Sequence, residues 1–515
     1  MFILGSIIKR AIELRSIIPT FSDISSNDAY KSQKRTLKRL LRRANETAFG
    51  EHYHFWEILK NKNIVKSFQN NVPVHDYNSI YKQWWFRTLT GESYVCWPGS
   101  VKYFALSSGT SEASSKYIPV TNDMIKAIKK ISIRQIISLA KYDFPNEFYQ
   151  KGILMLGGST HLQYNGTYYE GDLSGITAGN LPFWFQHFYK PGKRISKERE
   201  WSTKLDEIVK NAKSWDIGVI VGVPAWLQIL MERIIKYYDV KTIHDIWPNL
   251  SIYVHGGVSF VPFMKGFEKL LSHPITYIET YLASEGFIAF QSRPNTESME
   301  LVLDNGIFYE FVPFNETNFN SDGNIIESPQ TLTIKDVEEN KEYALLLSSC
   351  SGAWRYLIGD TIKFTSLEKN ELQITGRTKH FLSLCGEHLS QENMNTAVKM
   401  LDDELNLDIR EFTVAGIKCD SMFAHKWYLG IDKEILPEVA KQKIDESLKS
   451  LNDDYRVERI AAIKDVTVEI LPSDVFYDWM RQKGKEGGQN KFPRVLKNQQ
   501  IKEWEEHILK YKQQH

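Results

Sequence analysis

The sequence predicts an α/β protein with a large N-terminal domain, whose mixed and parallel sheets are flanked by helices, and a smaller α+β C-terminal domain. Short apolar runs bounded by Gly or Pro alternate with amphipathic stretches over most of the chain, which is typical of strands covered by crossover helices. After about Thr375 the pattern changes to a smaller set of elements. The 515 residues, 42% of them apolar, exceed one ordinary core, so we expect more than one domain.

The first predicted elements are helices. Residues 1–18 alternate apolar and charged side chains, and we interpret them as an amphipathic helix packed on the body rather than as a targeting segment. Leu37, Leu40, Leu41 and Ala44 recur at helical spacing among lysines and arginines, which predicts a second helix with a basic outer face. Such faces are usually only solvated, although a nucleic-acid-binding surface on residues 34–43 remains an alternative.

Strands and helices then follow in alternation. The apolar runs predict strands at 103–106, Gly152–Gly157, Ile217–Gly222, Leu250–Gly256, Ile275–Tyr281 and Tyr343–Ser348. Amphipathic stretches that follow turn or cap signals predict helices at Asn122–Leu139, Lys204–Ala212 and Trp226–Tyr237.

The C-terminal part reads as a compact module. We predict strands at Phe412–Ile417, Trp427–Ile431 and Val466–Ile470, and a helix near Pro437–Leu451. The predicted domains are therefore 1–374 and 375–515, and the second has an ordinary domain size.

Composition restricts the function classes. With 64 Lys and Arg against 63 Asp and Glu, the net charge of +1 gives no global attraction to nucleic acid or to an anionic membrane. No run approaches the ~20 apolar residues of a membrane span. The four cysteines form no Cys-x-x-Cys pair, which argues against a structural zinc site and a disulfide framework and favours a reducing cytoplasm.

One segment has the composition of a phosphate-binding loop. The strand that begins at Tyr103 leads into Ser107, Ser108, Gly109, Thr110 and Ser111, and then to Lys116. Hydroxyls and exposed backbone N–H groups bind anionic oxygens, glycine allows close approach, and lysine adds a positive charge. The spacing differs from that of a P-loop, and taken alone the run is equally typical of an ordinary turn after a strand.

A second segment places an acid and a hydroxyl just past an apolar strand, where ligands bind in α/β sheets. It contains Tyr281, Ser284 and Glu285. Glu285 is a candidate Mg²⁺ ligand and Ser284 a candidate α-phosphate contact. The alternative is a surface glutamate in a turn.

Three further residues suit a nucleotide site. Asp360 follows Gly359 after an apolar run and could accept hydrogen bonds from a ribose diol. Arg377 lies at the predicted domain boundary and could contact phosphate or ribose in one domain orientation. Lys491 follows Gly487 and Gly488, which permit the movement that would bring it to a distant active site.

The organic substrate can be assigned only to a region. Glycine-rich and aromatic stretches at 157–161, 173–179, 182–185 and 223–226 suit the walls of a pocket for a small organic acid, although core packing explains them equally well. Within them His161 is a candidate base, but a lone histidine near a strand end is more often structural.

In this order, these segments resemble the GH3 family of acyl-acid amido synthetases, within the ANL superfamily of acyl-adenylate-forming enzymes. The resemblance starts at Ala44–Gly50 and Val72–Tyr77 and includes the Ser107–Ser111 loop with Lys116. It continues through Tyr281-x-x-Ser284-Glu285 and Gly359-Asp360, and it ends at 488–494 with Lys491. Five ordered motifs are far more specific than any one of them.

The resemblance implies roles for single residues. The 107–111 loop and Lys116 match the family's phosphate-binding motif, and Tyr281, Ser284 and Glu285 match its second nucleotide motif. Asp360 matches the ribose-binding aspartate. Arg377 resembles the arginine after the hinge, Lys491 resembles the catalytic lysine of a mobile C-terminal domain, and Gly256 and Gly257 lie where the superfamily contacts adenine. Two departures, Ala113 for glycine and Leu357 for arginine, bear on rate and substrate more than on reaction type.

The activity that the resemblance implies is two-step. Mg·ATP and a small carboxylic acid give acyl-AMP and pyrophosphate, and an amino acid then takes the acyl group as an amide. ATP and Mg²⁺ are the expected cofactors, and a cytoplasmic monomer with no nucleic-acid or membrane partner is the expected form. Two alternatives stay open, namely an acyl-CoA ligase of the same superfamily and a nucleotide-binding relative without catalysis.

Overall fold

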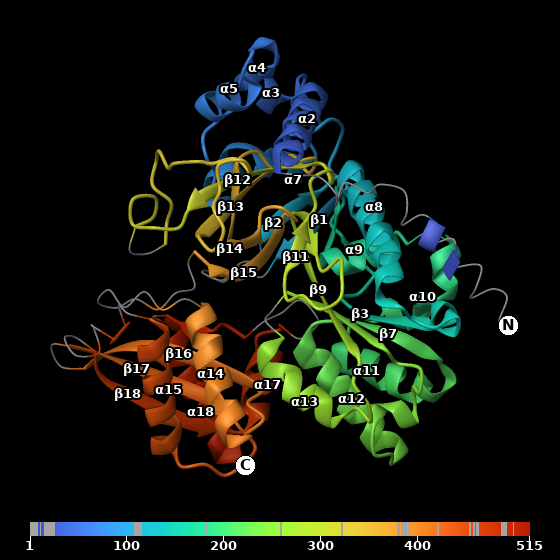
Figure 1. Ribbon diagram of the computed structural model, residues 1–515, viewed down its shortest axis with the longest axis vertical. Helices are drawn as coiled ribbons and strands as arrows, with labels where there is room; N and C mark the ends of the chain where they lie inside the picture. Colours follow the sequence, from blue (N-terminus) through green and yellow to red (C-terminus); the bar gives the residue numbers. More distant parts are fainter. Residues whose placement is uncertain are drawn as a thin grey trace.

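The computed structural model describes residues 9–10, 12–14, 26–107, 116–181, 183–257, 260–320, 323–378, 382, 389, 391–419, 422–452, 455–456, 459, 463–485, 492–497 and 499–514. Figure 1 shows a large domain, built from the described residues up to Arg377, and a smaller C-terminal module that begins with α14 (Gln391–Leu405). The α/β class predicted from the sequence is confirmed. Most of the predicted helix at residues 1–18 lies outside the described residues.

Eleven strands within the described residues form one mixed sheet in the order β12-β13-β14-β15-β11-β10-β9-β8-β7-β3-β6. Their bounds are β12 Ile307–Pro313, β13 Glu342–Ser349, β14 Tyr356–Ser366, β15 Glu371–Arg377, β11 Met299–Leu301, β10 Gly286–Phe290, β9 Thr276–Ala283, β8 Ile252–Gly256, β7 Ile217–Gly222, β3 Gly152–Leu156 and β6 Tyr189–Lys190. The strands from β9 to β6 pair in parallel, so that their carboxyl ends share one edge of the sheet.

The parallel half has the predicted crossover helices. They are α11 (Trp201–Asn211) and α12 (Pro224–Tyr238). A third, short helix that was not predicted, α13 (Met264–Lys269), joins them, and the apolar residues of all three form one buried cluster with β3, β7 and β8. Sequence reasoning placed the start of α11 three residues too late, because Glu200 caps it by accepting from the N–H groups of Ser202 and Thr203. It started β8 too early, since the N–H of Leu250 donates to the carbonyl of Trp247 in a turn.

The other half of the large sheet is antiparallel. The predicted strand Tyr343–Ser348 lies here as part of β13, not among the parallel strands. Four helices, α2 (Ser26–Ala44), α3 (Ala48–His52), α4 (Phe55–Lys60) and α5 (Ile64–Asn71), lie over this half, as Figure 1 shows in blue. They share its largest apolar cluster with α8 (Asn122–Ser138), which begins at the Thr121 cap.

A second sheet in the large domain holds the strands around the predicted phosphate loop. Its order is β2-β1-β5-β4, with β1 Tyr103–Ser107, β2 Lys116–Val120, β5 Tyr169–Gly171 and β4 Gln163–Tyr164. β1 and β2 are antiparallel neighbours, so that Ser107 and Lys116 face each other at the ends of residues 108–115. β1 also pairs in parallel with β5.

The C-terminal module is a four-stranded sheet, within the described residues, between two helical layers. Its order is β18 (Ile463–Leu471), β17 (Met422–Gly430), β16 (Glu411–Cys419) and β19 (Val495–Leu496). α14 and α15 (Pro437–Leu451) share one apolar cluster with the sheet, and α17 (Ser473–Gln482) and α18 (Gln499–Gln514) share another. The predicted helix 437–451 is confirmed, and β17 begins five residues before its predicted start.

Ion pairs join the C-terminal module to the parallel half of the large domain. Arg410 pairs with Glu232 on α12 at 3.2 Å, Lys265 on α13 pairs with Asp403 at 3.2 Å, and Lys269 pairs with Asp408 at 3.5 Å. Polar interfaces of this kind are typical of domains that change orientation.

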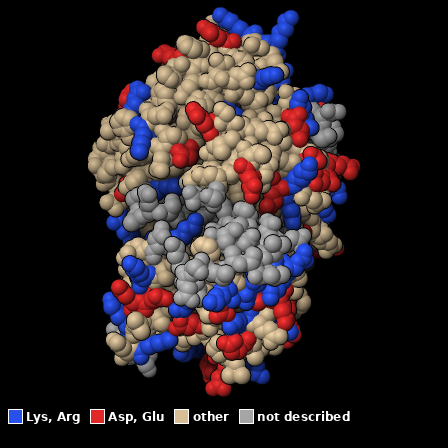
Figure 2. All heavy atoms as spheres, turned by 90° about the vertical axis from the view of Figure 1, so that its left-hand side faces the viewer, with Lys and Arg blue, Asp and Glu red and all other residues tan. Residues whose placement is uncertain are grey.

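Charges of both signs are mixed over the face shown in Figure 2, as expected from a net charge near zero. None of the helices in the described part of the chain is long and apolar enough to cross a bilayer.

His75 couples the helical layer to β14, which carries Asp360. Its N–H donates to the carbonyl of Arg355, and its Nδ1 lies 3.0 Å from the carbonyl oxygen of Trp354. Burial lowers the pKa of His75 to about 4, and the charge of Arg355 adds to this. The ring is therefore neutral in the native state near pH 7.

We expect the protein to lose stability as the pH is lowered from about 6.5 to 4. In this window the unfolded chain binds a proton at His75 and the native protein does not, so the free energy of unfolding falls by up to ~1.4 kcal/mol per pH unit for this group. Urea unfolding of the wild type and of His75→Gln between pH 7 and 5 measures the difference. Burial also lowers the pKa of His255 to about 4, so the variant keeps the part of the pH dependence of stability that comes from His255. Equal slopes in both proteins would contradict the assignment to His75.

Candidate active site

Three of the predicted site residues meet on the large sheet. The hydroxyl of Tyr281 on β9 donates to Oδ2 of Asp360 on β14 at 2.5 Å. Nε of Arg377 on β15 lies 3.1 Å from Oδ1 of the same carboxylate. Burial raises the pKa of Tyr281, and the charge of Asp360 raises it further, so the phenol stays a donor. Tyr281 lies 79 residues before Asp360 in the chain, and Arg377 lies 17 residues after it. Their contacts define one polar cluster.

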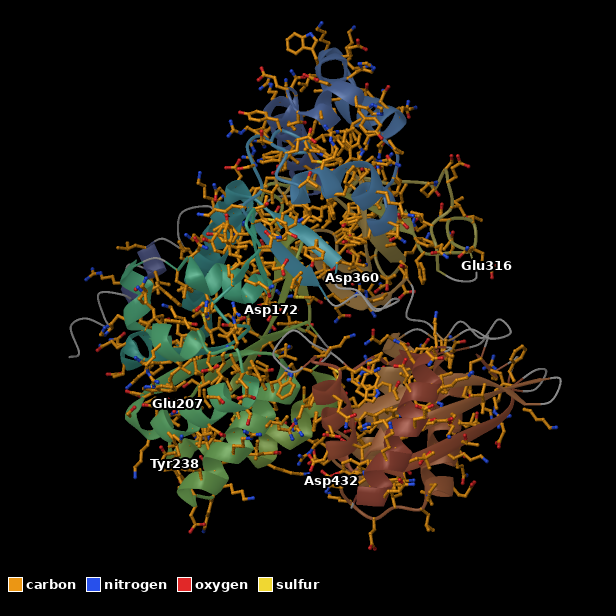
Figure 3. The ribbon with its side chains drawn as sticks, turned by 180° about the vertical axis from the view of Figure 1, so that it is seen from behind. Asp172, Glu207, Tyr238, Glu316, Asp360 and Asp432 are labelled. Atoms are coloured by element: carbon orange, nitrogen blue, oxygen red, sulfur yellow. The ribbon has the colours of Figure 1, made fainter. Side chains whose placement is uncertain are left out.

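Backbone geometry brings Asp360 and Arg377 together. The two residues are direct partners in the β14–β15 ladder. Between the strands, Nη2 of Arg377 donates to the carbonyl of Ile358 at 3.0 Å. Gly359 has φ +90, and a Cβ there would lie 3.3 Å from Nη2 of Arg377. Glycine at this position therefore avoids backbone strain and leaves room for the guanidinium. Figure 3 shows Asp360 on the side of the large domain that faces the C-terminal module.

Glu285 lies in the tight turn between β9 and β10, four residues beyond Tyr281. Only 6% of the residue is exposed. Burial raises the pKa of Glu285 to about 7, and the negative charge of Asp360 contributes, while Lys116 and Arg377 act in the opposite direction. A buried carboxyl beside a second carboxylate gains from a nearby cation. This donor chemistry fits Mg²⁺, which typically uses one or two carboxylates together with phosphate oxygens.

The residues described contain no cluster of three or more His, Cys, Asp or Glu side chains that would form a complete metal cage. A cation at Glu285 would therefore need ligands from a bound substrate, which is how Mg²⁺ binds in many phosphate-transfer sites.

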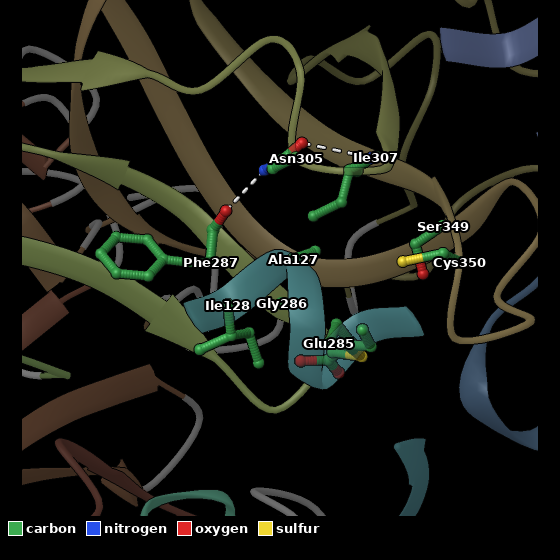
Figure 4. Close-up of a pocket in the computed structure, with 10 residues that line it drawn as sticks. Ala127, Ile128, Glu285, Gly286, Phe287, Asn305, Ile307, Ser349 and Cys350 are labelled. Atoms are coloured by element: carbon green, nitrogen blue, oxygen red, sulfur yellow. Dashed lines mark hydrogen bonds between the residues drawn. The ribbon is translucent and has the colours of Figure 1, made fainter. Parts of the chain in front are cut away.

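A small cavity lies behind Glu285, between α8, β10 and the end of β13 (Figure 4). It measures about 10 Å³, which is close to the smallest space for one water molecule. Asn305 closes one side, where its amide donates to the carbonyl of Phe287 and its oxygen accepts from the N–H of Ile307. Cys350 lines the cavity as an unpaired, buried thiol. The cavity is too small for a nucleotide, so any substrate must approach Glu285 from its other side.

Sequence reasoning missed Tyr77, which holds the start of β2. Its hydroxyl accepts from the N–H of Tyr117 at 2.9 Å, and Nζ of Lys116 lies 5.4 Å from the centre of its ring. Asp76 caps the short helix that carries Tyr77 by accepting from the N–H of Ser79. The motif Val72–Tyr77 thus positions Lys116, through a contact across 40 residues that no local sequence pattern indicates.

Gly256 ends β8 in the register position next to Thr280 of β9. A Cβ at Gly256 would lie 2.2 Å from the carbonyl oxygen of Thr280, so only glycine fits. Gly257 follows with φ +83, a conformation that favours glycine. Both lie one strand from Tyr281, at the carboxyl edge of the parallel strands.

Several predicted site residues cannot be placed. Residues Ser108, Gly109, Thr110, Ser111 and Lys491, and the departure Ala113, lie outside the described residues. Of Ser107 only the backbone is described, and Ser284 forms the turn with Glu285. The second departure, Leu357, is buried in an apolar cluster with Val312, Phe319, Ala344 and Leu346.

In the region expected to hold the organic acid, one predicted residue lies in the core, one is exposed, and others lie outside the described residues. Trp226 is buried in the apolar cluster of α11 and α12, where its ring packs edge-on against Trp201 at 5.2 Å. Tyr477 of the C-terminal module contacts its other side, with ring centres 6.4 Å apart. His161 is exposed, and its carbonyl accepts from Arg199. Pro182 and the side chains of Phe183 and Trp184 are outside the described residues.

Known proteins resemble this chain along most of its length. Jasmonoyl–L-amino acid synthetase JAR6 of Nicotiana attenuata is 22% identical over 479 residues, which cover 79% of this chain and 79% of that protein. Indole-3-acetic acid-amido synthetase GH3.3 of Arabidopsis thaliana is 24% identical over 276 residues, 49% of this chain and 45% of that protein.

Solved structures share the fold. GH3.15 acyl acid amido synthetase superposes with a TM-score of 0.77 at 16% identity, covering 98% of this chain and 96% of that one. A 2-hydroxyisobutyryl-CoA ligase in the postadenylation state gives a TM-score of 0.61 at 11% identity, covering 93% and 92%.

Family profiles match three stretches that together exceed half of the chain. The GH3 family N-terminal domain matches residues 20–165, the central domain residues 300–377, and the C-terminal domain residues 392–500. The central match ends at Arg377, and the first match contains β1, β2 and Lys116. This chain therefore belongs to the GH3 family.

Proposed function

We propose that this protein is an acyl-acid amido synthetase. In the first step a carboxylic acid attacks the α-phosphorus of ATP, which forms acyl-AMP and breaks the bond to pyrophosphate. In the second step the amine of an amino acid attacks the acyl carbon, which forms the amide, releases AMP and loses one proton to solvent. The observation that carries the proposal is the cluster of Tyr281, Asp360 and Arg377 beside Glu285 in a chain of the GH3 family.

We assign the nucleotide to this cluster. Asp360 accepts hydrogen bonds from the ribose hydroxyls, and Tyr281 and Arg377 hold its carboxylate in place. We assign the adenine to the backbone of Gly256 and Gly257, which follows the end of β8 at the carboxyl edge of the parallel strands. The loop formed by Ser107, Ser108, Gly109, Thr110 and Ser111 binds phosphate oxygens together with Lys116 and Ser284.

Glu285 is the proposed ligand of Mg²⁺. When bound there, the ion would neutralise charge on the phosphates during the first step. Burial and Asp360 raise the pKa of Glu285 to about 7, so a cation would be needed to keep this carboxyl fully ionised at neutral pH. Phosphoryl chemistry depends mainly on positioning and charge neutralisation, which these side chains supply.

The reaction also requires a change of domain orientation. The expected boundary at 374/375 would cut β15, which stays in the large sheet through Arg377. We propose that the part of the chain beyond Arg377 rotates, so that Lys491 reaches the α-phosphate in the first step and leaves before the amine enters. The C-terminal module contacts the large domain through the ion pairs Arg410–Glu232 and Asp403–Lys265, and such a polar interface supports movement. We further propose a cytoplasmic location, which the unpaired thiols of Cys96 and Cys350 support, and a monomeric state.

Pyrophosphate release from Mg·ATP, measured across a panel of carboxylic acids with and without amino acids, tests the proposal. We expect release that depends on one class of acid, rises with an amino acid and is lost in Glu285→Ala. An acyl-CoA product would instead identify the acyl-CoA ligase. ATP binding without pyrophosphate release would identify a non-catalytic relative. Plant hormones such as jasmonate and indole-3-acetate belong in the panel, because the names of the relatives include them.

We expect Lys491→Ala to lower acid-dependent ATP–pyrophosphate exchange by about 100-fold, because one cation aimed at developing charge contributes about this much. Transfer from chemically prepared acyl-AMP to the amino acid is expected to change less than threefold. Lys485→Ala, which changes an exposed lysine six residues earlier in the sequence, is the control. Unchanged exchange in the Lys491 variant would refute its role.

A further inference from the structure

A half-buried carboxylate and a buried lysine lie at the same edge of the large domain as the proposed nucleotide site and do not pair with each other. Lys204 on α11 is 3% exposed, and its Nζ donates to the carbonyl of Gly157 at 3.2 Å. Asp172 precedes α9 (Leu173–Gly179) but does not cap it with its side chain. Within the described residues, neither Asp172 nor Lys204 has an ion-pair partner within 4.0 Å, and the carboxylate of Asp172 accepts no hydrogen bond.

The two groups nevertheless influence each other. Burial lowers the pKa of Lys204 to about 8, with the charges of Asp172 and Glu198 opposing the shift. Burial raises the pKa of Asp172, with Lys204 opposing it. Each charge is thus partly desolvated, close enough to sense the other, and too far away for a direct contact. Among the described residues, Lys204 has only a neutral carbonyl as hydrogen-bond partner and Asp172 accepts no hydrogen bond, and desolvated charges without a charged partner are costly, which favours a ligand between them.

The fold brings this pair to the carboxyl edge of the parallel strands. Gly157 directly follows β3, and β3 lies three strands from β9, which carries Tyr281. A Cβ at Gly158 would lie 2.0 Å from Oδ2 of Asp172, so the carboxylate rests on bare backbone. The indole ring of Trp201 lies 5.6 Å from Nζ of Lys204.

Asp172 also lies close to β1, the strand whose end leads to the predicted phosphate loop. Gly171 is the partner of Ala105 in the parallel β1–β5 ladder, so Asp172 comes level with Leu106 as β1 runs toward residue 108. Figure 3 shows Asp172 between Asp360 and Glu207, the latter one turn beyond Lys204 on α11. A substrate held by this pair would lie between the ends of β1 and β3, on the side of the sheet where the proposed function forms acyl-AMP.

We propose that Asp172 and Lys204 bind the α-amino acid acceptor as a zwitterion, with Asp172 accepting from its ammonium group and Lys204 donating to its carboxylate. This inference rests on the proposed function. A zwitterion matches both charges at once, whereas the acyl acid would match Lys204 alone and be repelled by Asp172. The pair would then select amino acids over simple amines, through charge-assisted hydrogen bonds at two points.

The test compares amino acids with their α-amides, which keep the ammonium group and lack the carboxylate. Lys204→Met is expected to lower kcat/KM for the amino acid by ~10–100-fold, as for loss of a hydrogen bond to a charged group, and to leave kcat/KM for the amide within threefold. Asp172→Asn is expected to lower both by ~10-fold or more. Asp206→Asn and Lys210→Met, exposed positions on the same helix, are the matched controls.

The ratio of kcat/KM for the amino acid to kcat/KM for its α-amide is independent of the amount of folded enzyme, so a partly unstable variant still gives a result. Acid-dependent ATP–pyrophosphate exchange without amino acid separates the two proposals. The inference is supported if Lys204→Met and Asp172→Asn both keep wild-type exchange and the kcat/KM ratio falls at least tenfold in Lys204→Met. If the variants keep exchange and the kcat/KM ratio is unchanged in Lys204→Met, the inference is overturned and the proposed function is not. No exchange in the wild type with any acid overturns the proposed function, and the inference with it.

Discussion

Asp360→Ala is expected to lower kcat/KM for ATP in the exchange reaction by about 1000-fold, equivalent to ~4 kcal/mol of transition-state stabilisation. The carboxylate is the common acceptor for Tyr281 and Arg377, and in the proposed function it also binds the ribose. Its loss removes the ribose contact and leaves a buried phenol and a guanidinium without their partner. Hydrogen bonds to charged groups contribute ~1.5–3 kcal/mol each, so two such losses account for the expected magnitude.

Two variants make the result specific. Asp360→Asn keeps the size of the side chain and one acceptor, so we expect an intermediate loss. Glu338→Ala, an exposed acid in a surface ion pair with Lys341, is the control and should match the wild type. Thermal unfolding of each variant separates a loss of ATP affinity from a loss of fold. An ATP KM and kcat within twofold of wild type in Asp360→Ala would exclude Asp360 from the nucleotide site.

Glu310→Ala is expected to destabilise the large domain by ~3–5 kcal/mol, because it breaks a buried ion pair and leaves the guanidinium of Arg355 uncompensated. Nε and Nη2 of Arg355 both donate to the carboxylate of Glu310 at 3.0 Å. Its remaining N–H groups donate to the carbonyls of Gln69 and Val72 and to the hydroxyl of Thr331. All five donors are therefore satisfied, on a residue that is only 4% exposed.

Urea unfolding followed by tryptophan fluorescence measures this loss. The double variant Glu310→Leu/Arg355→Met is expected to be more stable than Glu310→Ala, since it leaves no unpaired buried charge. Arg233→Met serves as the control, because Arg233 pairs with Asp206 on the surface, where 40% and 57% of the two side chains are exposed. A loss below ~1 kcal/mol in Glu310→Ala would show that Arg355 finds other partners.

This network has a functional consequence. Arg355 joins residues 69–72 to the strand that carries Asp360. Its backbone has φ +42, which is unusual for a residue other than glycine. Weakening the network is therefore expected to affect the nucleotide site through β14 as well as the stability of the domain.

The sequence alone determined the class of fold, most of the elements and the family. β7, α8 and α15 were predicted within one residue, because apolar periodicity, a Thr121 cap and an N-terminal Pro437 act over a few neighbouring positions. The ordered motifs identified the family, since their residue types and spacing are visible without coordinates.

Only the tertiary structure decided which side chains meet. Tyr281 and Asp360 are 79 positions apart and Asp172 and Lys204 are 32 apart, and no local pattern encodes such pairs. Their positions follow from strand order and ladder register, which depend on how the whole apolar core packs. The antiparallel half of the large sheet, the contact of Tyr77 with β2 and the raised pKa of Glu285 have the same origin. Burial and charge are properties of the folded surroundings, whereas the residue types that respond to them are already present in the sequence.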